Sequence, residues 1–267
     1  MRNKEIVILG SAGMLGQMVK KYFSAAGHSI TCFDNRFNYE NRPAYGAYLR
    51  SLRNAVVFNC IGKIKQKTDD AGDLLQANAI LPAELRNGLH EDVILIHPST
   101  DCVFNGEKGL PYAVTDEADA TDDYGWSKRL GEVVLTGRAN TLIPRVSIIG
   151  PDRNPLGKGL LAWVMSNKPG TTIKGFTNHL WNGITTLEWC RQIDDFLNKN
   201  QSFEFTLKQY GTTEHYTKYD MVTLFNDLFD LKLQIEPIET PSMVDRRLTP
   251  EIICKSLPEQ LKDIKLG

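Results

Sequence analysis

The sequence has little that would commit the chain to a membrane, a nucleic acid or a metal ion. Its formal net charge is −1 over 267 residues and its basic residues are scattered, so no surface for nucleic acid or anionic lipid is expected. No apolar run approaches the roughly 20 residues that span a bilayer. The apolar run before Gly10 is too short for the core of a signal peptide. The five histidines lack metal-ligand spacing, so no metal site is expected.

Cysteine is also scarce, and the cysteines form no Cys-x-x-Cys pair. Their odd number and dispersion are typical of reduced thiols in the cytoplasm. The five are Cys32, Cys60, Cys102, Cys190 and Cys254. With 42% hydrophobic and 24% charged residues, the composition is that of an ordinary globular protein. We therefore expect a cytoplasmic protein with neither nucleic acid nor membrane as partner.

The first 150 residues alternate two kinds of segment. Short apolar runs rich in Val, Ile and Phe lack polar alternation, which favours strands buried on both faces of a sheet. These runs are 5–9, 29–33, 55–59, 92–97 and 141–146. Between them lie segments with helical spacing, at 14–26, 44–53, 71–88 and 123–138. The alternation predicts an α/β fold with a doubly wound parallel sheet of the Rossmann type.

The pattern becomes less regular after Gly150-Pro151. Helices are expected at 159–167, 185–198 and 218–230, and strands at 171–175, 203–208 and 231–236. The helix at 185–198 and the strand at 203–208 read as one more βαβ addition to the main sheet. We therefore expect a dinucleotide-binding domain over residues 1–150. Residues 151–267 would form a small substrate-binding lobe and the last elements of the main sheet.

A glycine-rich turn follows the first apolar run and opens the first helical segment. It reads Gly10-Ser-Ala-Gly13-Met14-Leu15-Gly16. The first glycine permits a tight turn, the second lets the backbone approach a pyrophosphate, and the third allows close helix packing. The helix N-terminus supplies N–H groups and partial positive charge. These five numbered residues are candidate cofactor contacts, and the alternative is a glycine-rich turn without a ligand.

The end of the second apolar run carries two residues with opposite implications for the cofactor. Asp34 is placed to hydrogen-bond an adenosine ribose and to disfavour a 2′-phosphate. Arg36 could instead receive that phosphate through a bidentate contact. Either residue could also simply begin a turn. The sequence therefore predicts NAD(P)H and leaves the choice between NADH and NADPH open.

A tyrosine and a lysine lie one helical turn apart in Tyr124-Gly-Trp-Ser-Lys128. A lysine ammonium on the same helix face favours the phenolate, which would lower a tyrosine pKa that is ordinarily about 10. Upstream, Ser99-Thr100 ends an apolar run, and the Thr100 hydroxyl could hold a carbonyl oxygen. The order of glycine turn, hydroxyl and Tyr-x-x-x-Lys predicts a reductase with Thr100, Tyr124 and Lys128 as catalytic residues. The alternative for the tyrosine and lysine is a chance pair on an amphipathic helix.

These motifs resemble the extended short-chain dehydrogenase/reductase superfamily, and within it the dTDP-4-dehydrorhamnose reductase group of sugar-nucleotide reductases. The group's Ser-Thr-Asp-Tyr-Val-Phe-Asp-Gly stretch matches 99–106, with Cys102 in place of the tyrosine. Its Tyr-Gly-x-Ser-Lys-x-x-Gly-Glu helix matches 124–132, and Arg145 sits like its strand-end arginine. The likeness is specific over 4–150 and loose afterwards.

The resemblance implies reduction of a 4-keto nucleotide sugar, plausibly in cell-surface polysaccharide synthesis, and a homodimer is an open expectation. It extends the cofactor-binding set along the loop after the third strand and into the next helix, and Tyr124 and Lys128 belong to this set too. The added residues are Cys60, Ile61, Gly62, Lys63 and Asn78. It also implies a substrate-binding set, made of Cys102, Val103, Phe104, Arg145 and Trp181.

Two other functions remain open at this point. GDP-fucose synthase, an epimerase–reductase, also has a cysteine two residues after the catalytic hydroxyl, and a Cys102 thiolate could serve as an acid–base group. The second alternative is a non-catalytic NAD(P)-binding regulatory subunit. A nucleotide-sugar dehydratase is disfavoured because those relatives carry Asp-Glu after the threonine, whereas here Asp101 precedes a cysteine.

Overall fold

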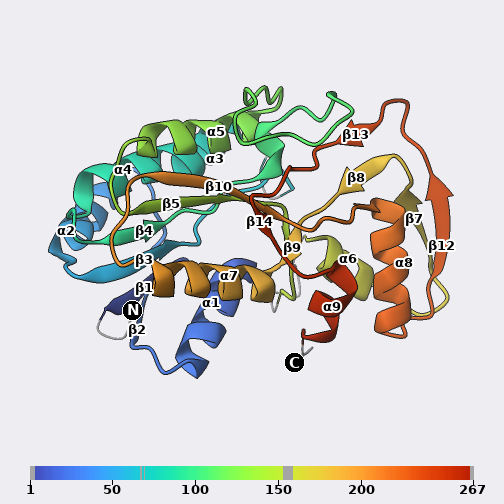
Figure 1. The fold of residues 1–267 in the computed structure, drawn as a ribbon, viewed down its shortest axis with the longest axis horizontal. Coiled ribbons are helices and arrows are strands. Elements are labelled where there is room, and N and C mark those ends of the chain that lie inside the picture. Colours follow the sequence, from blue (N-terminus) through green and yellow to red (C-terminus); the bar gives the residue numbers. More distant parts are fainter. Residues whose placement is uncertain (1–3, 67, 69, 153–158, 265–267) are drawn as a thin grey trace.

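The centre of the fold is a parallel sheet that has seven strands within the described residues (Figure 1). The computed structural model describes residues 4–66, 68, 70–152 and 159–264. The strand order is β14-β10-β5-β4-β3-β1-β2 and every pairing in it is parallel. The strands are β1 (Glu5–Leu9), β2 (Ile30–Phe33), β3 (Ala55–Asn59), β4 (Ile94–Ile96), β5 (Thr141–Arg145), β10 (Thr206–Gly211) and β14 (Ile252–Ile253). The predicted doubly wound Rossmann-type sheet is confirmed.

Helices cover both faces of this sheet because successive side chains of each buried strand point to opposite sides. On β1, Ile6 and Ile8 face α1 (Met14–Ala25) and α7 (Thr186–Lys199), while Val7 and Leu9 face the other layer. That layer contains α2 (Arg42–Ser51), α4 (Leu81–Gly88) and α5 (Asp123–Leu135). Figure 1 shows α4 and α5 along one side of the sheet and α1 and α7 along the other.

The strand order reverses between β1 and β3. The chain leaves β1 for β2 on one side and leaves β3 for β4 on the other. In open α/β sheets such a reversal opens a crevice outside the carboxyl ends of the two strands, where ligands bind. The glycine turn follows β1 and the loop 60–63 follows β3, so both flank this crevice.

The predicted helix at 71–88 is divided into three parts. α3 (Ala71–Leu75) is followed by a π-helical turn, Gln76–Ile80, and then by α4. Pro82 lacks the N–H that would bond to the carbonyl of Asn78, so the regular hydrogen-bond ladder is interrupted there. That carbonyl lies where a Cβ on Gly131 of α5 would meet it, at 2.3 Å. The interruption therefore brings the π-helical turn against α5.

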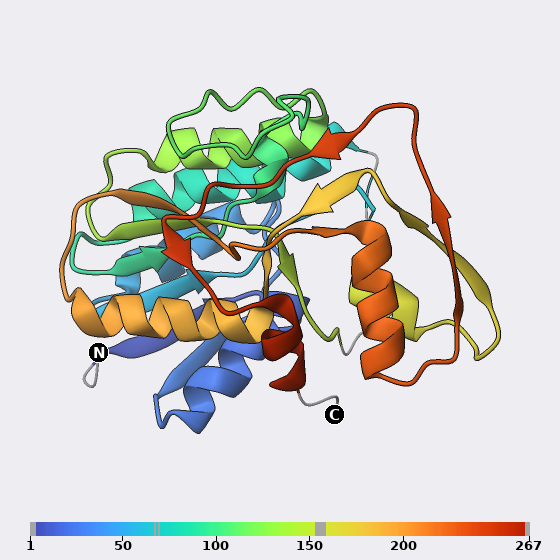
Figure 2. The ribbon, with the colours of Figure 1, turned by 45° about the vertical axis from the view of Figure 1, so that its right-hand side comes forward.

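A lobe built almost entirely from residues beyond 150 stands beside the main sheet (Figure 2). Its apolar core lies between helices and short strands and is separate from the two layers of the main sheet. The elements are β6 (Ile148–Ile149), α6 (Leu160–Met165), β7 (Thr172–Phe176), β8 (His179–Trp181), β9 (Ile184–Thr185), β11 (Tyr216–Thr217), α8 (Lys218–Leu228), β12 (Gln234–Ile238), β13 (Val244–Asp245) and α9 (Leu257–Lys262). The division at residue 150 stays a prediction.

The strand expected at 231–236 is displaced and occupies β12. Asp230 and Lys232 take left-handed backbone angles, with φ of 51° and 58°, so the extended run starts only after them. The expected addition of 185–198 and 203–208 to the main sheet is confirmed, because α7 packs on α1 and β10 pairs in parallel with β5. The strands of the lobe other than β7 and β12 are too short to leave a sequence pattern.

Candidate active site

The glycine turn is held by steric necessity at two of its three glycines. Gly10 has a φ of 79°, and a Cβ there would lie 2.7 Å from the Ile61 side chain. A Cβ on Gly16 would lie 2.2 Å from the Gly10 carbonyl oxygen. Gly13 is extended and precedes α1, whose N-terminus receives no side-chain cap. Its first-turn N–H groups are therefore available to a phosphate, which fits the predicted dinucleotide.

Two other predicted cofactor residues of α1 differ in exposure. The Leu15 side chain is buried in the core, so only its backbone could contribute to a ligand site. Met14 is half-buried, and its sulfur would lie 3.8 Å from a Cβ on Gly159. Of this pair, only Met14 could therefore offer a side chain to a ligand.

Asp34 and Arg36 are both exposed after β2. The Asp34 carboxylate accepts hydrogen bonds from the Ser11 backbone N–H at 2.6 Å and from the Ser11 hydroxyl at 2.7 Å. Asp34 therefore ties the end of β2 to the glycine turn. Arg36 contributes to lowering the pKa of Asp73, whose main cause is the hydrogen bond from Lys63. Arg36 and Lys63 thus bring two positive charges toward the same carboxylate.

The loop after β3 is clamped by Asn78, which is buried in the π-helical turn. Its Oδ1 accepts from the Lys63 N–H at 3.0 Å, and its Nδ2 donates to the Lys63 carbonyl at 2.9 Å and to the Ser127 hydroxyl at 2.9 Å. Ser127 in turn donates to the Tyr124 carbonyl at 2.8 Å. Asn78 therefore joins the loop to α5, which gives it a positioning role.

The Cys60 thiol stays protonated because burial raises its pKa.

The three predicted catalytic residues come together where α5 crosses the end of β4. The Tyr124 phenol lies close enough to Thr100 for this hydroxyl to lower its pKa, and Lys128 Nζ donates to the Pro98 carbonyl at 2.7 Å. Close approach of α5 depends on Gly125, since a Cβ there would lie 2.2 Å from the Cys102 carbonyl oxygen. The glycine between the tyrosine and lysine therefore has a steric cause. The Thr100 hydroxyl donates to Asp101 Oδ1 at 3.0 Å.

Electrostatics at the site correct one expectation from the sequence. Burial raises the pKa of Tyr124, the neighbouring Cys102 raises it further, and the hydrogen bond with Thr100 lowers it. The expected lowering of this pKa by Lys128 is not found: the only lowering contribution comes from Thr100, and burial raises the pKa. Burial also lowers the pKa of Lys128 to about 8, against the opposing charge of Glu132. The phenol is accordingly held in its protonated form.

Cys102 lies beside the predicted catalytic residues but is not activated. Burial raises the pKa of its thiol to about 12, with a further contribution from Asp101 and an opposing one from Arg246. The thiol donates to Asp101 Oδ1 at 3.7 Å. A thiolate is the nucleophilic and basic form of cysteine. The arrangement therefore gives no support to acid–base use of Cys102 near neutral pH.

Four predicted substrate-binding side chains are buried. Val103 and Phe104 belong to a small apolar cluster, where Phe104 stacks on Tyr112. Arg145 is occupied by an ion pair with Glu132. The Trp181 indole N–H donates to the Ser147 hydroxyl at 2.8 Å. Their contact with a substrate stays a prediction, and the packing gives it no support.

Two cations from the lobe lie near Cys102, which is next to the predicted catalytic residues. Lys218 begins α8, its ammonium lies 5.9 Å from the centre of the Trp181 ring, and burial lowers its pKa while the charge of Asp101 raises it. Arg246 follows β13, and its Nε donates to the Phe104 carbonyl at 2.9 Å. Sequence analysis missed Lys218, because a single lysine at the start of a helix carries no pattern. Only β11 and β13, on either side of β8, place it opposite the site.

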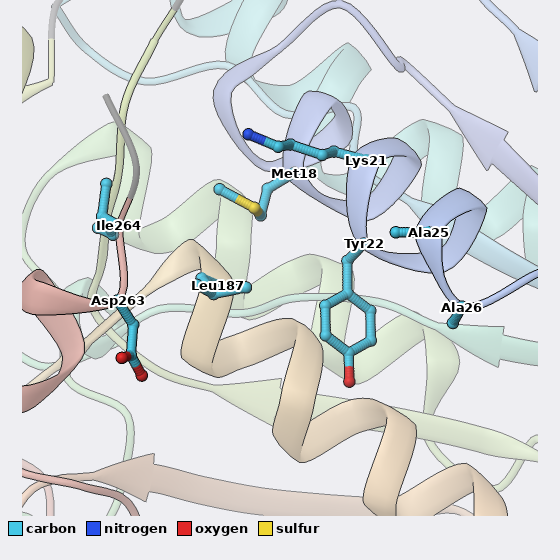
Figure 3. A pocket seen from close by; sticks show the side chains of 8 residues that line it. All are labelled: Met18, Lys21, Tyr22, Ala25, Ala26, Leu187, Asp263 and Ile264. Atoms are coloured by element: carbon cyan, nitrogen blue, oxygen red, sulfur yellow. The ribbon is translucent and has the colours of Figure 1, made fainter. Parts of the chain in front are cut away.

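A separate hollow of about 400 Å³ lies between α1, α7 and the end of α9 (Figure 3). Its lining includes Met18 and Tyr22 of α1, Leu187 of α7 and Asp263. None of the described residues predicted for the site lines it. Among all the residues that the structure describes, no helix is both long enough and apolar enough to cross a bilayer. In the same part of the chain, no cluster of acidic, histidine or cysteine side chains could hold a metal ion.

The model of the RmlD substrate binding domain family matches residues 4–167, more than half of the chain. The chain belongs to this family. It is 29% identical over 150 residues to the dTDP-4-dehydrorhamnose reductase of Mycolicibacterium smegmatis, covering 54% of this chain and 45% of the relative. It is 28% identical over 149 residues to the spore coat polysaccharide biosynthesis protein SpsK of Bacillus subtilis, covering 52% and 51%. This RmlD-family chain therefore spans about half the length of the curated relatives it matches.

Solved structures extend the likeness of this RmlD-family chain in fold alone. The dTDP-4-dehydrorhamnose reductase of Bacillus anthracis in complex with NADP superposes with a TM-score of 0.82 over 98% of both chains, at 16% sequence identity. The Rossmann-type arrangement of the sheet is therefore shared along almost the whole chain.

Proposed function

We propose that the protein is an NAD(P)H-dependent reductase of the 4-keto group of a nucleotide sugar. The observation that carries this proposal is the contact of the Tyr124 phenol with Thr100, with Lys128 one helical turn away. Contacts from Asn78 link this group to Lys63 beside the crevice of the sheet. The Mycolicibacterium relative is named for such a reduction, and the Bacillus anthracis structure contains NADP.

The residues of the crevice fit a dinucleotide. The glycine turn offers the backbone N–H groups of an uncapped helix, and the loop 60–63 follows the adjacent strand. When bound, the reduced nicotinamide supplies the hydride that reduces the carbonyl carbon. The chain itself must hold the carbonyl oxygen, supply a proton and bind the ribose.

Tyr124 donates the proton. Burial keeps its phenol protonated, so it can pass that proton to the carbonyl oxygen as negative charge develops. The Thr100 hydroxyl donates to Asp101 in this structure. After rotation it donates a hydrogen bond to the same carbonyl oxygen of the substrate. Lys128 is charged below a pH of about 8, where it stabilises the phenolate left after transfer and can donate to the ribose. Hydride and proton together convert the ketone to an alcohol.

Lys218 and Arg246 support an anionic substrate. Both lie near Asp101 and Cys102, so the side of the site formed by the lobe is positively charged. Burying a lysine ammonium costs free energy unless a partner compensates. A diphosphate between nucleoside and sugar would supply that partner, which favours a nucleotide sugar over an uncharged ketone. The identity of the sugar and of the nucleotide is what the assay must establish.

Three further expectations, on biological role, location and oligomeric state, accompany this proposal. The SpsK relative is named for polysaccharide biosynthesis, and we propose a role of that kind for the product. A cytoplasmic location is consistent with the free thiols of all five cysteines. A homodimer is supported by Trp126, Leu130 and Val133, which expose apolar side chains one helical turn apart on α5. Light scattering after gel filtration measures the oligomeric state.

The test follows the absorbance of reduced nicotinamide with NADH or NADPH and a panel of 4-keto sugars linked to dTDP, UDP or GDP. Oxidation that requires both substrate and enzyme, and that is lost in Tyr124→Phe, is expected. The same measurement ranks the two cofactors and the nucleotides. Cofactor binding by calorimetry without turnover across the panel would contradict the proposal and favour a regulatory subunit.

A further inference from the structure

One face of α5 meets the segment 98–100 that follows β4 at three successive turns. Tyr124 lies beside Thr100, which lowers its pKa, Lys128 donates to the Pro98 carbonyl, and Glu132 accepts from the Ser99 hydroxyl at 2.6 Å. Residues four apart on a helix lie on the same face. The proposed catalytic pair and Glu132 therefore form one row, placed along the segment that carries Thr100.

Glu132 is a buried carboxylate, 1% exposed, with four hydrogen bonds. Besides Ser99, Arg145 Nε donates to its Oε1 at 3.0 Å, Arg145 Nη2 to its Oε2 at 2.8 Å, and Arg129 Nη1 to its Oε2 at 2.9 Å. Arg145 is 1% exposed and its guanidinium lies 5.0 Å from the centre of the Phe104 ring. The pair therefore ties α5 both to the end of β5 and to the residue next to Thr100.

Stability alone does not account for this pair. Removing two charges from water is costly, and packed apolar residues often replace a buried ion pair without loss of stability. What apolar residues could not reproduce is the fixed geometry of a bidentate contact and a negative charge next to Lys128. The buried Glu132–Arg145 pair therefore contributes a fixed position and a negative charge next to the site, rather than stability alone.

Among the groups around Lys128, Glu132 is the one whose charge favours the protonated form of the lysine. Burial lowers the pKa of Lys128 to about 8, and the Glu132 charge raises it. Directly after β4, His97 lies near Lys128 as a neutral ring, because burial and then the Lys128 charge hold its pKa well below its ordinary value. Arg145 and Arg129 balance the charge of Glu132 from its far side.

We infer that Glu132 is a positioning residue of the reductase site, which with Arg145 and Ser99 fixes α5 against Thr100 and places a negative charge beside Lys128. The inference rests on the proposed function for the roles of Thr100, Tyr124 and Lys128. It also assigns Arg145 to the support of the site, in place of the substrate contact expected from the sequence.

The first experiment measures the titration of Lys128 without any substrate. Competitive acetylation followed by mass spectrometry across a pH series gives the titration midpoint of Lys128 in the wild type and in Glu132→Gln. The glutamine keeps the size and the acceptor for Ser99 but removes the charge. We expect the midpoint to fall by about one pH unit, and the alkaline loss of kcat to move to lower pH by a similar amount.

The matched control is Glu188→Gln, which removes another buried carboxylate, 2% exposed, from α7 on the other face of the sheet. Its Lys128 midpoint and pH profile should remain those of the wild type. An unchanged midpoint and an unchanged kcat in Glu132→Gln would overturn the inference. If the midpoint moves but the wild type reduces no sugar of the panel, the charge relation stands and the proposed function fails.

Ser99→Ala tests position separately from charge, and it decides the question if Glu132→Gln does not fold. It removes one hydroxyl while leaving the Glu132–Arg145 ion pair in place. We expect kcat to fall roughly tenfold, because small displacements of catalytic groups are costly, while cofactor affinity and the Lys128 midpoint stay unchanged. A wild-type kcat in Ser99→Ala would refute the positioning role.

Discussion

Replacing Lys128 with methionine should stabilise the folded protein at neutral pH while abolishing its activity. Lys128 is 7% exposed, and burial lowers its pKa to about 8, against about 10.4 for a free lysine. Below a pH of about 8 the lysine is charged in both the folded and the unfolded state, so the folded state bears the full unfavourable free energy of burying the charge. Each unit of pKa difference corresponds to about 1.4 kcal/mol, which gives about 3 kcal/mol.

The lost hydrogen bond to the Pro98 carbonyl opposes this gain. A hydrogen bond from a charged donor contributes about 1.5 kcal/mol or somewhat more, and methionine leaves that carbonyl without its donor. The net gain in the free energy of unfolding is then about 1 to 2 kcal/mol. For a chain of this size, about 2–4 °C in Tm per kcal/mol is expected, so Tm should rise by about 2–8 °C.

The sign of the pH dependence gives the sharper test. Between a pH of about 8 and about 10.4 the unfolded state binds more protons at this lysine, so the stability of the wild type rises with pH. The stability advantage of Lys128→Met should therefore shrink over that interval. Differential scanning calorimetry at a series of pH values measures it, with Lys199→Met, an exposed lysine paired with Asp195, as control. A Lys128→Met variant that is less stable than wild type at neutral pH, or whose advantage does not change with pH, would refute the reasoning.

Three further substitutions test the proposed roles. Tyr124→Phe should lower kcat by about 10²-fold or more and leave the cofactor Kd nearly unchanged in calorimetry, whereas wild-type turnover would exclude the phenol as proton donor. Asn78→Ala removes three hydrogen bonds that join Lys63 to α5, and at about 1 kcal/mol each it should lower the free energy of unfolding by about 3 kcal/mol in urea and weaken cofactor binding; a loss below about 1 kcal/mol would contradict the clamp. Cys102→Ala should retain the reductase activity, with no solvent deuterium entering the sugar by mass spectrometry in either protein, and deuterium incorporation that depends on Cys102 would instead establish the epimerase–reductase.

The parallel sheet and the glycine turn could be predicted from the residues alone, because both depend on local rules. Continuous apolar runs can be satisfied only between two layers of helices, and the glycines at 10 and 16 are required by contacts within a few residues or with the adjacent strand. The row of Tyr124 and Lys128 was predictable for the same reason, since helix geometry fixes the relation of residues four apart. The division of the predicted helix at 71–88 was not, although Pro82 marked its position.

The electrostatics of the site and the roles of several side chains depend on how distant elements pack, and could not be predicted in this way. The sequence placed Lys128 on the same helix face as Tyr124 but could not show that burial would raise the tyrosine pKa, because desolvation depends on all the elements packed around the phenol. Arg145 read as a substrate contact until its burial against Glu132 was seen. Lys218 reaches the site only because short strands, too brief to leave a pattern, fold the lobe over it. Steric requirements within a turn or helix depend on neighbouring residues, so they can be predicted from the sequence. Burial and electrostatic environment depend on residues that lie far apart in the chain, so they cannot.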